Sequence, residues 1–359
     1  MKIPLALTLR LSASIWGGFI APIAEDHMAI LVIGGAGYIG SVTVSQLTEA
    51  GEDVVVLDNL SRGHRAAVVS GPKLVVGDMA DRELLADLLR EREIEAVLHF
   101  AAHSLVGESM EKPLLYWENN VQAGVTLLRA MAEAGVKRII FSSTAAVYGE
   151  PAEVPITENC PIKPTNTYGV TKWTFEQLLA DADRAHGIRS VRLRYFNAAG
   201  CTERCGEDHT PETHLIPVIL QVALGQRKGV SIYGEDYPTR DGTCVRDYIH
   251  VSDLARAHLL ALGHLRAGGK STAFNLGNGE GFTVREIIEI ARETTGHPIP
   301  AAVGPRRAGD PATLIASSAR IAKVLGWKPE CSDIRSIIQS AWAWHREHPQ
   351  GYSDGQADR

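Results

Sequence analysis

The chain has 359 residues with 45% hydrophobic and 22% charged side chains, which is close to the norm for soluble globular proteins and enough for one large domain or two ordinary ones. The net charge of -6, without basic clustering, argues against nucleic acid as a partner. Five widely spaced cysteines favour reduced thiols and a cytoplasmic protein. No metal site is expected, because Cys201 and Cys205 have no second cysteine or histidine pair at ligand spacing.

The first 27 residues are apolar with basic residues near the start. Arg10 interrupts the apolar run, so the segment is too broken to cross a membrane and makes a poor signal peptide. We expect the folded protein to begin at Met28, with residues 1–27 disordered or an artefact of an upstream start. Export is the less favoured alternative, and no membrane partner is predicted.

The first predicted strand leads into a glycine-rich loop. Residues 29–33 form a continuous apolar run, as in a strand that is buried on both faces of a parallel sheet. Gly34, Gly37 and Gly40 follow, and then an amphipathic helix to about Ala50. An ordinary glycine-rich turn is the alternative, but strand, loop and helix stand in the order that dinucleotide binding requires. The N–H groups at the helix start would then face a pyrophosphate.

The second predicted strand, residues 53–57, ends at Asp58, about twenty residues past the glycines. A carboxylate at this position accepts hydrogen bonds from both ribose hydroxyls and repels a 2′-phosphate, so the predicted cofactor is NAD rather than NADP. Arg62 and Arg65 lie near enough to be weighed as phosphate ligands, with solvated loop charges as the alternative.

The third predicted strand, residues 73–76, ends just before Asp78, which is placed to meet the adenine amino group. The alternative role for Asp78 is the N-cap of a helix at residues 82–90. The fourth predicted strand, residues 96–100, ends in small residues over which a flat cofactor can lie.

The fifth predicted strand, residues 138–141, delivers Ser142 and Thr144 to the carboxyl edge of the sheet. Alternating strands and helices of this length predict an α/β fold with a doubly wound parallel sheet, which binds ligands at that edge. The hydroxyl of Thr144 and the glycine loop are therefore expected along one edge.

Tyr168 and Lys172 stand four residues apart at the start of a predicted helix, which puts them one turn apart on one face. A lysine charge favours a phenolate, so Tyr168 is expected to act as a base nearer neutral pH than a free tyrosine does. The hydroxyl of Thr144 is placed to share the proton. These three residues are the predicted catalytic group, and they predict proton exchange with an alcohol beside a hydride acceptor.

After Asn197 the pattern turns irregular, and loops rich in glycine, proline and charge separate short predicted helices. We predict residues 28–197 as the NAD-binding domain and residues 198–349 as a smaller α+β substrate-binding domain, some of whose segments return to the main sheet. Residues 350–359 form a polar tail that is expected to fray.

An ordered set of motifs runs from Met28 to about Tyr352. Among them are GGAGYIG at 34–40, DNLS at 58–61, SSTAAVYG at 142–149, NTYGVTK at 166–172, RYFN at 194–197, HLIP at 214–217, GTCVRDYIHVSD at 242–253 and RRAGD at 306–310. With this set the chain resembles the extended short-chain dehydrogenase/reductase family, and within it the epimerases of UDP-hexoses. No single motif is decisive, but the ordered set is highly specific.

The resemblance implies tightly bound NAD and a UDP-sugar substrate that is oxidised and reduced at carbon 4, which interconverts UDP-glucose and UDP-galactose in galactose metabolism. It implies Tyr168 as the base, Lys172 as its modulator and Thr144 as the partner of the sugar 4-hydroxyl. The implied cofactor contacts are Gly34, Gly37, Tyr38, Ile39, Gly40, Asp58, Asn59, Asp78, Met79, Phe100, Ala101, Ala102, Asn119, Tyr168, Lys172 and Phe196. The implied UDP-sugar contacts are Thr144, Asn197, His214, Leu215, Ser231, Ile232, Tyr233, Arg246, Arg307 and Asp310.

Several alternatives stay open beside this resemblance. A salt bridge with the neighbouring Asp247 is the alternative role for Arg246. Leu314 stands where a tyrosine in relatives restricts the room around the sugar's 2-position, so an N-acetylated UDP-sugar is a possible substrate, as is a UDP-pentose. Relatives pair the helices expected at 113–134 and 171–186 across a two-fold axis, which implies a homodimer; packing against the sheet is the alternative.

Two other classes of protein fit the residues less well. Sugar dehydratases on this fold need an Asp-Glu pair directly after the Ser-Thr, and here Ala145 and Ala146 occupy those positions. A non-catalytic regulator that senses NAD can lack the tyrosine and the lysine, and this chain has both.

Overall fold

In the computed structural model, which describes residues 28–307 and 310–353, a seven-stranded sheet is the central element, and all its neighbouring strands run parallel. From edge to edge its strands are β11 (Thr272–Leu276), β6 (Arg189–Tyr195), β5 (Arg138–Thr144), β4 (Ala96–His99), β1 (Ile30–Ile33), β2 (Val54–Asp58) and β3 (Lys73–Val76). The chain runs outward from β1 to β3 and returns to β4 on the other side of β1, so the strand order reverses there. Open parallel sheets bind ligands at the carboxyl end of such a switch point.

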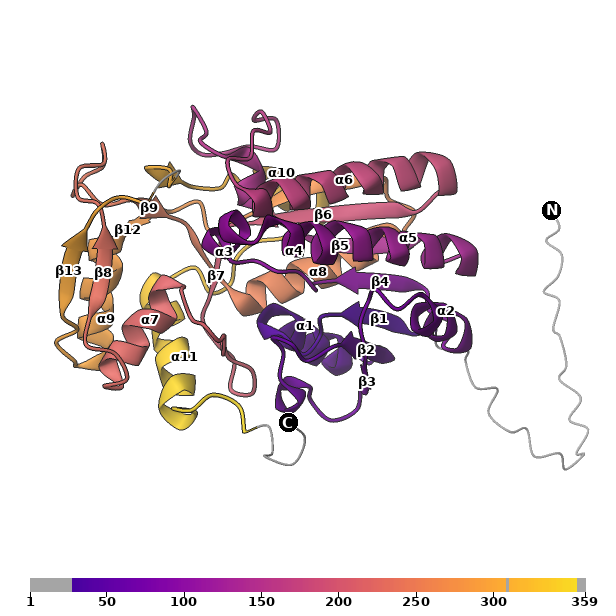
Figure 1. The fold of residues 1–359 in the computed structure, drawn as a ribbon, viewed down its shortest axis with the longest axis horizontal. Helices are drawn as coiled ribbons and strands as arrows, with labels where there is room; N and C mark the ends of the chain where they lie inside the picture. Colours follow the sequence, from indigo (N-terminus) through magenta and orange to yellow (C-terminus); the bar gives the residue numbers. More distant parts are fainter. Residues whose placement is uncertain (1–27, 308–309, 354–359) are drawn as a thin grey trace, which may run out of the picture.

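Helices lie on both faces of this sheet (Figure 1). They are α1 (Tyr38–Glu49) and α8 (Val251–Arg266) on one face, and α2 (Arg82–Glu91), α5 (Ala123–Ala134) and α6 (Thr167–His186) on the other. Because side chains alternate along a strand, Ile30 and Val32 pack toward the first group, and Leu31 and Ile33 pack toward the second. Every residue of β1, β2 and β4 is buried, which explains their continuous apolar runs. The predicted doubly wound α/β fold is confirmed.

The long helix expected at residues 113–134 is interrupted in its middle. It consists of α4 (Pro113–Trp117), a π-helical segment η2 (Glu118–Gln122) and α5, and it is preceded by α3 (Val106–Glu111). Within the π-helical segment, Asn119 is half-buried and Asn120 is buried. Asn120 Oδ1 accepts from the N–H of His103 at 2.9 Å, and its Nδ2 donates to the carbonyl of His103 at 3.0 Å. The segment therefore fastens the loop after β4, and such π-turns recur at functional sites.

A smaller lobe stands at the carboxyl edge of the sheet (Figure 1). Its elements are β7 (Asn197–Ala199), α7 (Leu215–Ala223), β8 (Val230–Tyr233), β9 (Val245–Arg246), β10 (Tyr248–His250), β12 (Phe282–Thr283), α9 (Val284–Thr295), β13 (Ala301–Gly304), β14 (Thr313–Leu314) and α11 (Ile334–Glu347). Its core gathers apolar residues of α7, α9 and α11, among them Ile219, Ile287 and Ile338. The strands pair as β13 with β8, β10 with β7, and β9 with both β12 and β14.

Some segments of the second predicted domain belong to the main sheet. Strand β11 forms its edge and α8 covers one face, while α10 (Ala319–Leu325) packs beside them. The short helices η1 (Arg65–Ala67) and η3 (Ala145–Tyr148) complete the elements. The domain boundaries at residues 197 and 349 stay predictions.

The expectations for residues 1–27 and for residues 354–359 of the tail lie outside the described part of the chain. Among the helices of the described residues, none combines the length and the apolar composition that crossing a membrane requires.

Candidate active site

The glycine loop lies at the switch point, between β1 and α1. Gly34 has a φ of +80°, and a Cβ there would come within 2.5 Å of the Ala101 nitrogen; a Cβ on Gly40 would come within 2.1 Å of the Gly34 carbonyl oxygen. The packing of the protein itself therefore requires these two glycines. Gly37 differs, because a Cβ there would meet only the Gly34 oxygen, at 3.4 Å, and Gly37 lines a large cleft. The open side of Gly37 fits the close approach of a pyrophosphate, as NAD would need.

Asp58 is fixed at the end of β2 by two backbone donors. Its Oδ2 accepts from the N–H of Ala36 and its Oδ1 from that of Leu60, both at 2.9 Å. Burial raises the pKa of Asp58, and these two hydrogen bonds oppose the rise. Arg62 is not a solvated loop charge: it donates to the carbonyl of Thr210 at 2.7 Å and forms an ion pair with Glu108 at 3.5 Å. These two N–H donors leave further lone pairs on the carboxylate oxygens of Asp58. Ribose hydroxyls can donate to those lone pairs, as the NAD prediction requires.

The alternative role considered for Asp78, that of a helix N-cap, is wrong. The N-cap of α2 is Asp81, whose side chain accepts from the N–H groups of Glu83 and Leu84. Asp78 lines the cleft instead, and its Oδ2 accepts from Asn59 Nδ2 at 2.8 Å. The carboxylate thus faces the space expected for the adenine, although the contact itself stays a prediction.

The catalytic group lies where β5 and α6 meet. Strand β5 continues past the expected end at Phe141 to Thr144, because its pairing with β6 extends as far as Tyr195. Helix α6 begins at Thr167, so Tyr168 and Lys172 occupy its first turns. Lys172, Tyr168 and Thr144 are buried, with 3%, 9% and 8% of their surface exposed, yet all three line the cleft.

The electrostatics of this group differ from the prediction. Burial raises the pKa of Tyr168, although its hydrogen bond with Thr144 lowers it in part. Burial lowers the pKa of Lys172 to about 7, against a partial rise from the charge of Glu176. Lys172 Nζ donates to the carbonyl of Ser142 at 2.8 Å and lies 6.0 Å from the centroid of the Tyr168 ring. Burial thus acts against the predicted shift of the phenol toward neutral pH, and the role of Lys172 in that shift stays a prediction.

One cleft of about 1320 Å³ connects these residues with the smaller lobe. With one exception, every residue predicted to contact cofactor or UDP-sugar lines this cleft, including Tyr38, Ile39, Met79, Phe100, Ala102, Asn119, Phe196, Asn197 and Leu215. The exception is Ile232, which is buried in the core of the smaller lobe. Its neighbours Ser231 and Tyr233 on β8 face the cleft, since successive side chains of a strand point to opposite sides. The side chain of Ile232 therefore does not line the cleft, and a contact of this residue with the UDP-sugar stays a prediction for its main chain.

Two arginines from the smaller lobe face the cleft. The guanidinium of Arg246 forms an ion pair with Asp310, and that of Arg307 lies 3.9 Å from the centroid of the Tyr233 ring. The alternative partner of Arg246, Asp247, is wrong: its buried carboxylate accepts from the N–H groups of residues 278, 279 and 316 at 2.8, 3.1 and 3.0 Å. Arg246 and Arg307 thus bring two planar cations to one wall, which suits a diphosphate.

His214 precedes α7 and contacts residues that the sequence analysis did not consider. Its Nδ1 lies 2.8 Å from Glu212 and 3.0 Å from Glu207, and His209 completes the group. The only signal for this group in the sequence is the spacing E-x-H-x-x-E-x-H at 207–214, which matches no familiar motif.

Comparison with known proteins adds to this geometry. Residues 30–277 match the NAD dependent epimerase/dehydratase family. A UDP-glucose 4-epimerase of Halalkalibacterium halodurans is 56% identical over 334 residues, which are 92% of this chain and 100% of that protein. A UDP-glucose 4-epimerase from Bifidobacterium longum, solved in complex with NAD+ and UDP, has a TM-score of 0.86 at 40% identity over 90% of this chain and 100% of its own. A UDP-Glc/GlcNAc 4-epimerase from Campylobacter jejuni has a TM-score of 0.79 at 40% identity over 89% and 99%.

Proposed function

The chain belongs to the NAD dependent epimerase/dehydratase family, and from this membership we propose that it interconverts UDP-glucose and UDP-galactose in the cleft described above. The observation that carries the proposal is that one cavity is lined by the glycine loop, by Tyr168 with Thr144, and by Arg246 with Arg307. A dinucleotide site, a proton-transfer group and a diphosphate site thus share one space. NAD, when bound, supplies the hydride acceptor and donor for sugar carbon 4, and its positive charge favours the phenolate.

Tyr168 takes the proton of the sugar 4-hydroxyl in one half of the reaction and returns it in the other. Thr144 hydrogen-bonds the Tyr168 hydroxyl and is placed to bond the sugar oxygen as well. Lys172 holds its ammonium between the carbonyl of Ser142 and the ring of Phe141, at 2.8 Å and 4.7 Å. From there it positions the cofactor ribose and contributes positive charge beside the phenol.

The residues of the smaller lobe hold the nucleotide end of the substrate. Arg246 and Arg307 bind the diphosphate, and Asn197, whose Nδ2 donates to the carbonyl of Asp247 at 2.9 Å, is braced beside them. Binding energy from contacts far from carbon 4 can hold the UDP part of a UDP-4-keto-sugar in place while the sugar part rotates. A sugar held only through its nucleotide end would be free to present its other face, which inversion at carbon 4 requires.

A second candidate substrate is a UDP-N-acetylhexosamine. Leu314 lines the cleft, and a leucine leaves more room than a tyrosine. The Campylobacter jejuni relative is named for both UDP-Glc and GlcNAc. Turnover of UDP-galactose and UDP-N-acetylgalactosamine should be compared for the wild type and Leu314→Tyr. Loss of only the second activity supports this substrate, and no wild-type activity on it excludes it.

The main test uses the purified protein without added NAD. UDP-galactose is supplied, the UDP-hexoses are separated and measured, and absorbance in the reduced-nicotinamide band is followed. We expect UDP-glucose to form, together with a slow rise in absorbance. If no UDP-glucose forms even after NAD is added, the proposal fails.

We also propose that the protein is a cytoplasmic homodimer. Leu114 and Met110 are 73% and 60% exposed, and Trp117 is 37% exposed, so α3 and α4 present apolar side chains that a second copy would cover. The five cysteines are free, in keeping with a reducing compartment. Sedimentation of the wild type and Leu114→Asp tests the dimer: a monomeric wild type would exclude it.

A further inference from the structure

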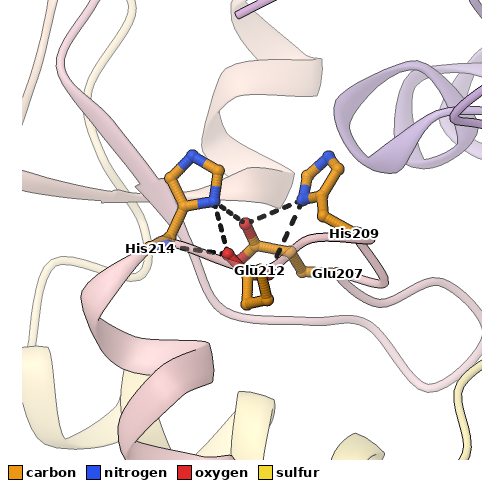
Figure 2. A group of neighbouring side chains, drawn as sticks. All are labelled: Glu207, His209, Glu212 and His214. Atoms are coloured by element: carbon orange, nitrogen blue, oxygen red, sulfur yellow. Dashed lines mark hydrogen bonds and ion pairs between the residues drawn. The ribbon is translucent and has the colours of Figure 1, made fainter. Parts of the chain in front are cut away.

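Four side chains from the loop between β7 and α7 converge on one point at the wall of the cleft. They are Glu207, His209, Glu212 and His214, and their ligating atoms all lie within 4.8 Å of one another (Figure 2). We propose that this group, called here the 207–214 cluster, binds one Zn²⁺ ion. The inference concerns a site separate from the proton-transfer group and does not depend on the proposed reaction.

The spacing of the donor atoms fits a tetrahedral ion. His209 Nδ1 lies 3.2 Å from Glu207 Oε1 and 3.7 Å from Glu212 Oε2. His214 Nδ1 lies 3.0 Å from Glu207 Oε1 and 2.8 Å from Glu212 Oε1. In a tetrahedral zinc site with bonds of about 2.0–2.1 Å, neighbouring ligand atoms stand roughly 3.3 to 3.4 Å apart. The four distances bracket this value, but they involve both carboxylate oxygens of Glu212, so a shift of that side chain would have to bring one oxygen into the site.

Charge and burial also suit a divalent cation. Glu207 and Glu212 are 4% and 6% exposed, and their two carboxylates neutralise one doubly charged ion. Two imidazole nitrogens with two carboxylate oxygens favour Zn²⁺ over the hard cations Mg²⁺ and Ca²⁺, which prefer oxygen alone. The side chain of His214 is 45% exposed, which gives an ion a way in from the cleft.

Neighbouring groups already hold the ligands in place. Glu212 Oε1 accepts from the N–H groups of Thr213 and His214 at 2.6 and 2.7 Å. Arg227 donates to the carbonyl of Glu212 at 3.0 Å, and the ring of Tyr38 meets that of His209 edge-on at 6.3 Å. Such outer contacts orient the first ligands of metal sites.

Four protein ligands close the coordination shell, so the site is structural rather than catalytic. The loop it would fix reaches the cofactor side, where His64 Nε2 lies 3.0 Å from the carbonyl of Asp208, and it also leads into α7. A bound ion would therefore hold the two sides of the cleft together at this point. The rival account is an ion-pair network of two protonated imidazoles and two carboxylates, without metal.

Zinc binding by the full-length protein decides between these accounts. After dialysis against a chelator, the protein is titrated with Zn²⁺ in competition with a chromophoric chelator, and the melting temperature is recorded with Zn²⁺, with Mg²⁺ and without metal. We expect one Zn²⁺ per chain, and a rise in melting temperature with Zn²⁺ but not with Mg²⁺.

Variants locate the ion. His209→Gln and Glu212→Gln should each weaken Zn²⁺ binding by about tenfold or more, and each should lose the zinc-dependent rise in melting temperature. His186→Gln, which changes an exposed histidine at the end of α6, should bind like the wild type. No Zn²⁺ binding by the wild type, or equal binding by all three variants, would overturn the proposal and leave the ion-pair network.

Discussion

The two sides of the cleft are built in different ways. The cofactor side comes from successive β-α units, so its key residues follow the ends of neighbouring parallel strands: Gly34 after β1 and Asp58 at the end of β2. The substrate side is assembled from β8, β9 and β14 and from the loop that contains Arg307, which are short pieces far apart in the chain. In the β-α units, each key residue follows the carboxyl end of a strand. On the substrate side, the position of each residue depends on which short strands pair.

The two sides also treat charge differently. On the proton-transfer side, Lys172 has no carboxylate hydrogen-bonded to its ammonium among the described residues, and burial lowers its pKa. On the substrate side, Arg246 forms an ion pair with Asp310, and Arg307 lies over an aromatic ring. We infer that the proton-transfer side holds a desolvated lysine that is suited to proton chemistry. On the substrate side, the ion pair and the aromatic ring stabilise the two arginine cations until an anionic ligand binds. The predictions below test this contrast.

The largest effect is expected from Tyr168→Phe. Loss of the phenolic hydroxyl should lower kcat by about 10²- to 10⁴-fold while NAD stays bound, because the ring still fills its place. The measurement is steady-state turnover of UDP-galactose together with the NAD content of the purified variant.

Tyr148→Phe is the matched control for that variant. Tyr148 is also buried, and its hydroxyl donates to Asn275 Oδ1 at 2.7 Å, but it does not line the cleft. This variant should lose stability rather than turnover. Near-normal turnover by Tyr168→Phe would contradict the role of the base.

Within the glycine loop, Gly40→Ala and Gly37→Ala should separate packing from ligand binding. A Cβ at position 40 meets the Gly34 oxygen at 2.1 Å, so this variant should lose about 1–3 kcal/mol of stability and its NAD as well. A Cβ at position 37 has its only close contact at 3.4 Å, so this variant should melt near the wild type but bind NAD more weakly. Melting temperatures without ligand and NAD titrations check both. Equal NAD affinity in Gly37→Ala and the wild type would argue against the pyrophosphate position.

On the substrate side, Arg246→Gln should raise the KM for UDP-galactose about 30-fold with a smaller change in kcat. The lost charged hydrogen bonds contribute about 2 kcal/mol, and they act on the nucleotide end in both the ground state and the transition state. Arg240→Gln is the control, because Arg240 pairs with Glu286 on the surface outside the cleft. A fall in kcat with unchanged KM would contradict an anchoring role for Arg246.

The difference between the two sides explains how much could be predicted from the sequence. Local periodicity and motif spacing predict the third strand at residues 73–76 and the positions of Asp58 and Tyr168, and the structure has them there. Local pattern left one alternative open, because Asp78 suits an N-cap by residue type, and only the start of α2 at Arg82, directly after Asp81, excludes that role.

Features that depend on distant pairing could not be predicted in the same way. Strand β5 extends to Thr144 because it pairs with β6. Whether the side chain of Ile232 points into the core or into the cleft depends on the pairing of β8 with β13. The π-helical turn at Asn119 and Asn120 depends on the loop around His103 that it fastens. Each of these features depends on contacts between different segments of the chain, and the order of residues alone does not specify such contacts.

A further effect concerns pH and the stability of the protein. Lys172 titrates at about 7 when folded and at about 10.4 when unfolded, so between these values the unfolded chain binds more protons. The contribution of Lys172 to stability must therefore rise with pH across that window, and below pH 7 its buried charge is fully unfavourable.

Lys172→Met isolates this contribution. The variant should melt above the wild type at pH 7, and the difference should shrink steadily toward pH 10, because the wild type regains stability as its folded lysine loses its proton. Lys137→Met is the control, since that exposed lysine only donates to the carbonyl of His186 at 2.9 Å and should show a constant difference. Melting temperatures across this range check the prediction. A Lys172→Met difference that stays constant with pH would mean that Lys172 keeps an ordinary pKa, and that the contrast between a desolvated side and a paired side is mistaken.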